Sequence, residues 1–268
     1  MDGRTVLVDQ LRALLEEYYT QYYRDTLGLP DWRSKVGGRL GEEDVEAHRV
    51  EAVSLIIGRP VRGLRVLNLG CGTGGFNVAA ERAGAETWGI DANRQAIRIC
   101  QLRRELGAGG RYAVTRAEEL PFQDDAFDLV YCLSTLEHVR DVERSIEEMV
   151  RVTRPGGAVM LYAPNSWSMY ENHYKVFWLP RFPRPLARLY LRVLGRPTKF
   201  VETLNYLTPT RCARLLRKAG ATVEPFGLVK PDGRASGLVG RLVRLYYRVF
   251  NIAPAIQLLG RKTPRKPP

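Results

Sequence analysis

The sequence of 268 residues predicts a doubly wound α/β domain, with a mostly parallel sheet and helices on both of its faces. Two observations predict this fold class. After residue 60, short apolar segments alternate with helical segments, and a glycine-rich turn joins the first apolar segment to the helix that follows it. An apolar content of 45% allows a sizeable core, which excludes disorder as the main state of the chain.

The first 60 residues are predicted to form an N-terminal helical cap. Residues 5–27 have the pattern of an amphipathic helix and contain four closely spaced tyrosines. A second helix is predicted over 42–58, because acidic residues at its start suit the positive end of the helix dipole.

Residues 61–163 carry the alternating pattern that predicts the sheet. Helices are expected to end near residue 82 and to span 92–106 and 140–153. Right-handed crossovers bring the intervening strands into one parallel sheet with helices on both faces. The predicted strands are 65–69, 86–90, 111–115, 127–133 and 158–163.

Residues 164–206 interrupt this alternation and are rich in aromatic residues, proline and arginine. They are predicted to form a basic helical insertion that overhangs the edge where the strands end, as a lid on the acceptor side. The core is expected to resume over 207–262, and the tail 263–268 is expected to fray. The elements predicted in the resumed part are a helix at 208–219, a strand near 221–228, a basic apolar segment at 235–251 and a last strand at 256–262.

The net charge of +12 belongs to the last third of the chain. Residues 1–174 hold 21 Lys and Arg against 26 Asp and Glu, whereas residues 175–268 hold 20 against 3. This asymmetry indicates that the carboxyl-terminal third meets an anionic partner, either nucleic acid or a phospholipid surface.

Cysteine usage and the first residues indicate the compartment. The four cysteines have neither disulfide-framework nor zinc-ligand spacing, and the first ten residues lack a signal-peptide pattern. The expected location is therefore the reducing cytoplasm, with peripheral contact at the inner membrane face. The longest uncharged run of the basic third, 249–260, is shorter than the roughly 20 residues that cross a bilayer.

A glycine-rich turn with Gly70, Gly72 and Gly74 follows the first predicted strand. Glycine lets the backbone turn sharply and approach a ligand beside the start of the next helix, although a tight structural turn alone has the same pattern. Asp91 ends the second strand, where its carboxylate can accept both hydroxyls of a ribose. The two features predict a nucleotide-like ligand, and NAD is one alternative because Gly70, Gly72 and Gly75 match the dinucleotide pattern.

Four motifs resemble those of the class I S-adenosylmethionine-dependent methyltransferases, especially the methyltransferase type 11 and ubiquinone-pathway enzymes. They are LNLGCGTG (67–74), GID (89–91), AEELPFQDDAFDLVYCLSTLEHV (117–139) and RVTRPGGAVML (151–161). The resemblance covers residues 64–163 and continues more weakly to residue 228. Dehydrogenases do not show the later motifs. The resemblance implies a Rossmann-like fold and S-adenosyl-L-methionine as the cofactor.

The resemblance also implies cofactor contacts. The three glycines of the turn would admit the methionine part, Asp91 would hold the ribose, and the Ala-Glu loop would cradle adenine above a lining leucine. Arg49 matches the arginine that reaches the cofactor carboxylate, although a solvated helix arginine is the alternative. The predicted cofactor-binding residues are Arg49, Asn68, Gly70, Cys71, Gly72, Gly74, Asp91, Ala92, Ala117, Glu118 and Leu133.

Three positions depart from the family pattern. Asn68 stands where the family usually has an acid, and Arg116 replaces the aspartate that often precedes the Ala-Glu pair. These departures leave a non-catalytic scaffold as an alternative. Ser134 occupies the place of a further glutamate in the ubiquinone-pathway enzymes, so no metal site is expected.

Methyl transfer from a sulfonium needs in-line alignment, and a base only when the acceptor carries a proton. His138 follows the fourth strand at the edge where ligands of such folds bind, and is the first candidate for that base. Glu171 and His173, in the insertion, are further candidates for acceptor binding or proton removal. Packing is the alternative role of all three residues.

Two arginine-bearing segments indicate the partner. Each places arginines every three or four residues among leucine, valine and tyrosine, which predicts helices lying on an anionic membrane, with packing on the domain as the alternative. The absence of RNA-binding motifs disfavours RNA as the anionic partner. RNA methylation is therefore the alternative to the predicted function. That function is O-methylation of a hydroxyl on a small or lipid-like acceptor: an isoprenoid, lipid-linked glycan or secondary metabolite. The arginines are Arg184, Arg188, Arg192, Arg241, Arg244 and Arg248.

Overall fold

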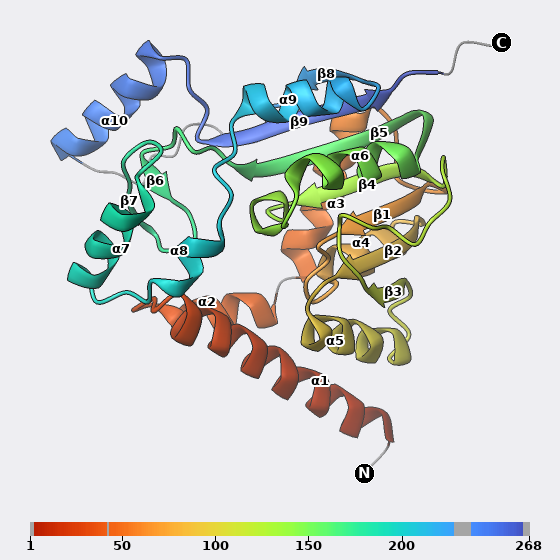
Figure 1. Cartoon of the computed structure of the whole chain (residues 1–268). Helices are drawn as coiled ribbons and strands as arrows, with labels where there is room; N and C mark the ends of the chain where they lie inside the picture. Colours follow the sequence, from red (N-terminus) through yellow and green to blue (C-terminus); the bar gives the residue numbers. More distant parts are fainter. Residues whose placement is uncertain (1–2, 42, 228–236, 265–268) are drawn as a thin grey trace.

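A computed structural model describes residues 3–41, 43–227 and 237–264. A seven-stranded sheet lies at its centre in the order β3-β2-β1-β4-β5-β9-β8 (Figure 1). Neighbours among β1 to β5 pair in parallel, and β9 runs antiparallel to both β5 and β8, which confirms the predicted mostly parallel sheet. The strands are β1 (Arg65–Leu69), β2 (Glu86–Asp91), β3 (Arg111–Val114), β4 (Phe127–Leu133), β5 (Thr153–Pro164), β8 (Ala221–Pro225) and β9 (Ala255–Lys262).

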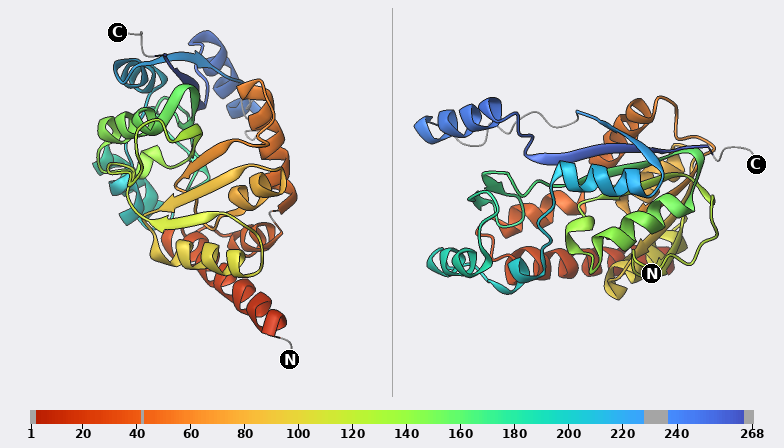
Figure 2. Two further views of the ribbon diagram at one scale, coloured as in Figure 1. Left: turned by 90° about the vertical axis from the view of Figure 1, so that its right-hand side faces the viewer. Right: turned by 45° about the horizontal axis from the view of Figure 1, so that its top comes forward.

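Helices cover both faces of the sheet (Figure 2). On one face α3 and α4 bury Val53 and Phe76, and the Phe76 ring stacks on Tyr131 of β4 with 4.0 Å between ring centroids. On the other face α6 and α9 bury Ile146 and Leu216. These helices are α3 (Glu43–Ile57), α4 (Gly75–Arg82), α6 (Val142–Val152) and α9 (Pro209–Lys218), and α5 (Arg94–Glu105) packs beside β3.

The N-terminal cap contains more elements than the pattern predicts. Helix α1 (Gly3–Thr20) continues into a single π-helical turn, η1 (Gln21–Thr26), so the predicted helix 5–27 is wound less tightly at its end. A further helix, α2 (Trp32–Leu40), was not predicted. It contains two adjacent glycines and buries only Val36, so its sequence carries little helical periodicity.

The insertion lies beyond the carboxyl ends of the parallel strands (Figure 1). It contains the short hairpin β6 (Tyr170–Glu171) and β7 (Val176–Phe177), followed by α7 (Arg184–Val193) and α8 (Lys199–Thr203). It has a core of its own, in which Tyr174, Trp178 and Leu191 pack with Leu27 from the N-terminal cap.

A last helix, α10 (Gly237–Val249), projects from the same end of the molecule as the insertion (Figure 2). The hydroxyl of Tyr247 accepts a hydrogen bond from the amide of Met169 at 3.0 Å and so attaches α10 to the insertion. The linker 228–236 and residues 265–268 of the tail that was predicted to fray lie outside the described residues. None of the helices in the described ranges is long and apolar enough to span a membrane.

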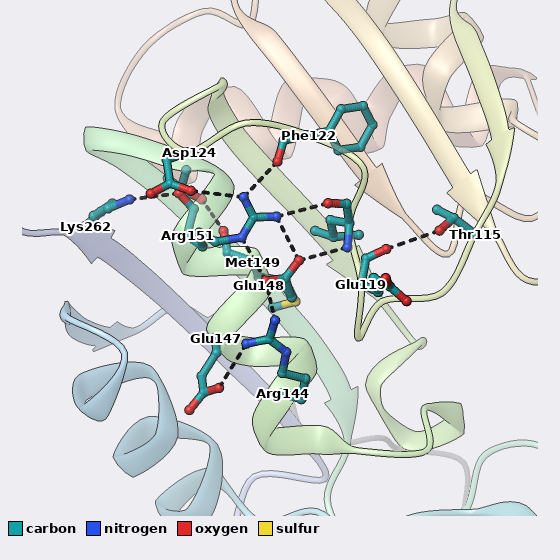
Figure 3. A network of polar contacts seen from close by, with 12 residues as sticks. Thr115, Glu119, Phe122, Asp124, Arg144, Glu147, Glu148, Met149, Arg151 and Lys262 are labelled. Carbon is teal, nitrogen blue, oxygen red and sulfur yellow. Dashed lines mark hydrogen bonds and ion pairs between the residues drawn. The ribbon is translucent and has the colours of Figure 1, made fainter.

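A polar network fixes the loop that follows β3 (Figure 3). Glu148 of α6 is 3% exposed, and its carboxylate accepts hydrogen bonds from the Leu120 amide at 2.8 Å and from the Arg151 guanidinium at 2.7 and 2.8 Å. Arg151 also donates to the carbonyls of Leu120 and Phe122. The network therefore joins the loop to α6 through one buried carboxylate.

Replacing Glu148 by alanine is expected to lower the free energy of unfolding by about 2–4 kcal/mol. The Leu120 amide would lose its acceptor, and the Arg151 guanidinium would lose the carboxylate that accepts two of its hydrogen bonds. Urea denaturation would measure this loss. Glu147 is the matched control on the same helix, since its side chain is more exposed and contacts Arg144 at 3.6 Å. Its replacement by alanine is expected to cost less than about 0.5 kcal/mol. Equal losses in the two variants would contradict the role given to Glu148.

Candidate active site

The turn after β1 holds glycines in a conformation that other residues rarely adopt. Gly70 and Gly72 have φ values of 74° and 52°. A Cβ on Gly70 would lie 2.1 Å from the Thr135 hydroxyl oxygen, so this position excludes any side chain. A Cβ on Gly72 would meet no atom of the described residues within 4 Å, its two chain neighbours aside. The space beside Gly72, which lines the cleft described below, is therefore open.

Asp91 at the end of β2 clamps this turn. One carboxylate oxygen accepts a hydrogen bond from the Gly72 amide at 2.9 Å, and the other accepts from the Asn93 amide at 2.8 Å. Burial raises the pKa of Asp91, although its backbone hydrogen bonds oppose this change. The side chain of Asp91 therefore shapes the glycine turn itself.

A large cleft of about 670 Å³ opens between the turn, the N-terminal helices and the insertion. Eight of the residues predicted for the site line it. They are Arg49, Asn68, Gly70, Cys71, Gly72, Leu133, His138 and His173.

The other predicted cofactor residues do not line this cleft. Gly74 is occupied with packing, because a Cβ there would lie 2.9 Å from the Cys100 sulfur. Ala117 is buried in the core beside the sheet. Glu118 accepts hydrogen bonds from the amides of Arg140 and Asp141, at 2.6 and 3.2 Å. These hydrogen bonds anchor the loop to the start of α6, and the adenine contact of Glu118 stays a prediction. The remaining two residues outside the lining are Asp91 and Ala92.

Two polar pairs sit on the wall of the cleft. The Arg49 guanidinium lies 2.5 Å from a carboxylate oxygen of Glu46, which is itself buried. The side-chain amide of Asn68 donates to the side-chain carbonyl of Asn77 at 2.7 Å.

Four tyrosines from α1 and η1 line one side of the cleft. They are not among the residues predicted for the site. The hydroxyl of Tyr19 lies 2.8 Å from that of Thr73 in the glycine turn, so the first helix is hydrogen-bonded directly to the turn. Burial raises the pKa of Tyr18, and the nearby Asp91 raises it further. The tyrosine cluster in the sequence is the signal for this wall. The four tyrosines are Tyr18, Tyr19, Tyr22 and Tyr23.

The candidate catalytic residues lie close together around Glu137, with Glu171 buried, His173 partly buried and His138 exposed. Nδ1 of His173 lies 2.7 Å from Oε1 of Glu171, and its Nε2 lies 3.7 Å from Oε1 of Glu137. Nε2 of His138 lies 3.9 Å from the same Glu137 oxygen. The Glu171 carboxylate also accepts a hydrogen bond from the Tyr174 amide at 2.6 Å, which fixes its orientation. The insertion thus brings Glu171 and His173 to the end of β4, where Glu137 and His138 lie.

Burial and charge set the protonation of this cluster. Burial raises the pKa of Glu137 to about 7, although the charge of His173 opposes this change. Burial also lowers the pKa of His138 to about 4, so its imidazole is neutral at physiological pH. For His173, burial acts to lower the pKa, but the hydrogen bond and charge of Glu171 together with the charge of Glu137 outweigh it and raise the pKa.

Glu137 was not among the residues predicted for the site, although it belongs to the Leu-Glu-His motif. It is 2% exposed, and neither of its carboxylate oxygens has a hydrogen-bond partner among the described residues. A buried carboxylate without donors is costly in a folded protein unless a ligand supplies them. This feature depends on tertiary burial, which the motif alone does not give.

A second, much smaller cavity of about 50 Å³ begins at the same cluster. It shares two lining residues, Pro164 and His173, with the large cleft. His173 therefore stands where the two cavities meet. The other lining residues are Glu137, Asn165, Ser166, Ser168, Tyr170, Glu171, Trp178, Val201, Leu204, Asn205, Tyr206 and Leu207.

Glu137, His138 and His173 also offer one potential metal ligand each, with these atoms within 4.8 Å of one another. Ser134, which led to the expectation of no metal site, is not one of these three residues. The two histidine nitrogens lie 3.7 and 3.9 Å from the glutamate oxygen. Ligands of a tetrahedral zinc ion lie roughly 3.3–3.5 Å apart, given metal bonds of about 2.0–2.2 Å. The spacing is wider than that of a formed zinc site, and it is also longer than a hydrogen bond.

Comparisons with known proteins place this site in context. Residues 67–161 match the family described as Methyltransferase domain. Proteins described as Ubiquinone biosynthesis O-methyltransferase from Aromatoleum aromaticum and Bordetella avium are each 32% identical to the chain, over 169 and 182 residues. The matches cover 62% and 67% of this chain, and 68% and 70% of those relatives. A third, from Mesorhizobium japonicum, is 28% identical over 174 residues, which cover 62% of this chain and 66% of the relative. The chain thus spans about two thirds of the length of these relatives.

Solved structures share the fold. The YcgJ protein of Bacillus subtilis has a TM-score of 0.56 and 19% identity, with 81% of this chain and 99% of that chain covered. Magnesium protoporphyrin IX methyltransferase from Synechocystis PCC 6803, solved with bound SAH, has a TM-score of 0.52 and 16% identity, with 84% and 85% covered. At such identities the likeness concerns the Rossmann-like fold.

Proposed function

Because the chain belongs to the class I S-adenosylmethionine-dependent methyltransferases, we propose that it methylates a hydroxyl of a lipid-like, isoprenoid-type acceptor. The observation that carries the proposal is the position of His173 between the two cavities, held by Glu171 on one side and facing Glu137 on the other. The names of the ubiquinone-pathway relatives support a hydroxyl acceptor.

The large cleft fits the cofactor, which is S-adenosyl-L-methionine. The open space beside Gly72 is a cradle that a side chain would fill, and Arg49 can pair with a carboxylate at the same wall. Tyr18 and Tyr19 offer aromatic surface opposite the turn. The bound cofactor supplies a methyl group on a positively charged sulfur. These residues would orient it and keep water away from it.

The reaction requires a proton to leave the acceptor hydroxyl, and His173 is placed to take it. With the Glu171 carboxylate accepting from Nδ1–H, the free Nε2 faces the cavity and can accept the proton. The charge of Glu171 then stabilises the imidazolium. His138 remains neutral beside the pair and serves as a packing or hydrogen-bonding group.

Calorimetric titration tests the cofactor part of the proposal. The protein is expected to bind S-adenosylmethionine and not NAD. Incubation with the cofactor and a lipid extract, followed by mass spectrometry, is then expected to reveal an acceptor that gains one methyl group. Binding of NAD in place of S-adenosylmethionine would overturn the proposal, and tight cofactor binding without any methylated product would indicate a scaffold.

Replacing Glu171 by glutamine is expected to move the rising limb of acceptor kcat/KM to lower pH. The neutral imidazole of His173 is the active form, and its pKa is raised by Glu171, so activity in the wild type rises as pH increases through that raised value. Without the carboxylate, burial lowers the pKa, even though Glu137 still faces the ring, with Lys175 opposing it. A pH profile would measure the shift.

Glu105→Gln, at an exposed position of α5, is the control for that profile and is expected to leave it unchanged. If the rising limb of the kcat/KM profile stays at the same pH in Glu171→Gln, then Glu171 does not set the pKa of His173.

We also propose that α7 and α10 hold the enzyme at an anionic membrane surface. Each helix leaves apolar side chains more than half exposed, including Leu189 of α7 and Leu242 of α10, instead of packing all of them on the domain. Arg184 and Arg188 contact Leu204 and Glu202 of the insertion. The arginines of α10, Arg241, Arg244 and Arg248, are exposed and are further candidates for lipid contact.

Replacing those three arginines together by glutamate is expected to weaken binding to vesicles of phosphatidylcholine and phosphatidylglycerol by at least roughly 100-fold, since each basic residue near an anionic surface contributes about 1 kcal/mol. Co-sedimentation at low salt would measure binding. The matched control changes three exposed arginines of α5, Arg94, Arg98 and Arg104, to glutamate. Equal binding by both triple variants, or no binding by the wild type, would remove the membrane proposal.

A further inference from the structure

A buried tyrosine hydroxyl lies at the wall of the large cleft. Tyr131 of β4 is 2% exposed and lines the cleft, and its hydroxyl has no hydrogen-bond partner among the described residues. The stacking of its ring on Phe76, with 4.0 Å between the ring centroids, holds the side chain in this place. Buried polar groups are nearly always hydrogen-bonded, so a ligand in the cleft is expected to supply the partner.

A pair of opposite charges acts on this hydroxyl. Glu46 and Arg49 lie three residues apart on α3, and both line the cleft. Burial raises the pKa of Tyr131, while the charge of Arg49 acts to lower it and that of Glu46 to raise it. The phenol therefore stays protonated at physiological pH and can donate a hydrogen bond beside the charged pair.

These three groups suit a ligand that carries both an ammonium and a carboxylate. A carboxylate would accept hydrogen bonds from the guanidinium and the phenol, and an ammonium would donate to the Glu46 carboxylate, which is buried. In S-adenosylmethionine the amino-acid end carries both groups on one carbon, whereas the ribose and adenine are neutral. The position also fits that end, because Phe76 is the second residue of α4 and so comes directly after the glycine turn.

We propose that Glu46, Arg49 and Tyr131 bind the amino-acid end of the cofactor. Glu46 accepts hydrogen bonds from the ammonium, and Arg49 and Tyr131 donate to the carboxylate. The proposal rests on the cofactor part of the proposed function, and it assigns roles to Glu46 and Tyr131, which are not among the residues predicted for the site. Both residues select a nucleoside that carries an amino acid, and they restrict the orientation of the sulfur that bears the methyl group.

Tyr131→Phe tests the hydroxyl, because it removes only that oxygen. The probes are S-adenosylhomocysteine and methylthioadenosine, which share the nucleoside and the thioether and differ in the amino-acid end. In calorimetric titrations the wild type is expected to bind S-adenosylhomocysteine at least roughly 100-fold more tightly than methylthioadenosine. Tyr131→Phe is expected to lose about tenfold in affinity for S-adenosylhomocysteine and nothing for methylthioadenosine.

The melting temperature of the ligand-free protein separates this role from a structural one. The Tyr131 hydroxyl has no partner among the described residues, so Tyr131→Phe is expected to melt at or above the wild-type temperature. Tyr112→Phe is the matched control, since it removes another buried hydroxyl that lacks a partner among the described residues and lies outside the cleft. It is expected to bind S-adenosylhomocysteine as the wild type does.

Glu46→Gln tests the charge and keeps the size of the side chain. It is expected to lose at least roughly tenfold in affinity for S-adenosylhomocysteine, with the affinity for methylthioadenosine unchanged. Glu51→Gln, at an exposed position of the same helix and outside the cleft, is expected to bind both probes as the wild type does. Equal losses for the two probes would overturn the proposal, and undiminished S-adenosylhomocysteine affinity in either cleft variant would overturn the role of that residue.

These titrations need neither an acceptor nor turnover, so their outcome is separate from that of the proposed methylation. A selective loss of S-adenosylhomocysteine affinity in both variants, without any methylated product from the wild type, would retain the amino-acid site and contradict the methylation. Methyl transfer by a wild type whose S-adenosylhomocysteine affinity does not depend on Glu46 or Tyr131 would retain the methylation and contradict the site.

Discussion

Replacing His173 by alanine is expected to lower kcat for methylation of a hydroxyl by about 10²–10⁴-fold, the usual contribution of a positioned general base. The acceptor hydroxyl would lose the histidine that lines both cavities. The glycine turn and Arg49 would remain to hold the cofactor. Single-turnover kinetics with saturating S-adenosylmethionine would measure the chemical step directly.

His138→Ala is the comparison for this variant. Its ring lies 5.3 Å from that of His173, but its lowered pKa keeps it neutral and it does not line the second cavity. We expect a loss of less than about tenfold. A larger loss in His138→Ala than in His173→Ala would reverse the two roles and make the first sequence-based candidate the base.

Gly72→Val is expected to weaken S-adenosylmethionine binding by at least roughly 100-fold. The new side chain would project into the open space beside the turn and would occupy the proposed cofactor cradle. Apart from the two chain neighbours, no atom of the described residues lies within 4 Å of the Cβ position. Equilibrium binding by calorimetry would measure the affinity. The positive φ of 52° adds backbone strain, which costs of order 1–3 kcal/mol for a residue other than glycine.

Gly63→Val separates strain from blocking. Gly63 also has a positive φ, 75°, and open space around its Cβ position, but it lies outside the cleft. Both variants are expected to lose similar stability in urea denaturation, and only Gly72→Val is expected to lose the cofactor. Comparable affinities in the two variants would show that the space beside Gly72 is not the cofactor cradle.

Most of the fold was predictable because each element carries a local signal. Alternation of apolar segments with helices placed all five parallel strands and the antiparallel β9 within a few residues of their observed bounds. The signal was weakest for α2, whose paired glycines hide its helical period, and for β6 and β7, which are two residues each. Such elements form because their neighbours pack on them, which no local pattern reports.

The site was predictable to a lesser degree. Glycine and aspartate signals depend on backbone conformation at a fixed place between a strand and a helix, so Gly70, Gly72 and Asp91 could be singled out from the chain alone. Glu118 could not be interpreted in the same way, because its carboxylate is used by two backbone amides 22 and 23 residues away. The lining role of Tyr18 and Tyr19 likewise depends on how α1 crosses the turn.

The sequence by itself determined the parallel core, the family and the cofactor, since these follow from short motifs whose geometry is local. Tertiary structure alone decided which titratable groups act together. Glu137 lies in a motif after β4 and Glu171 in the insertion, and only folding brings both within 4 Å of the same imidazole, that of His173. The physical reason is that burial and mutual charge, which set the protonation of this cluster, are properties of the assembled environment and have no counterpart in sequence spacing.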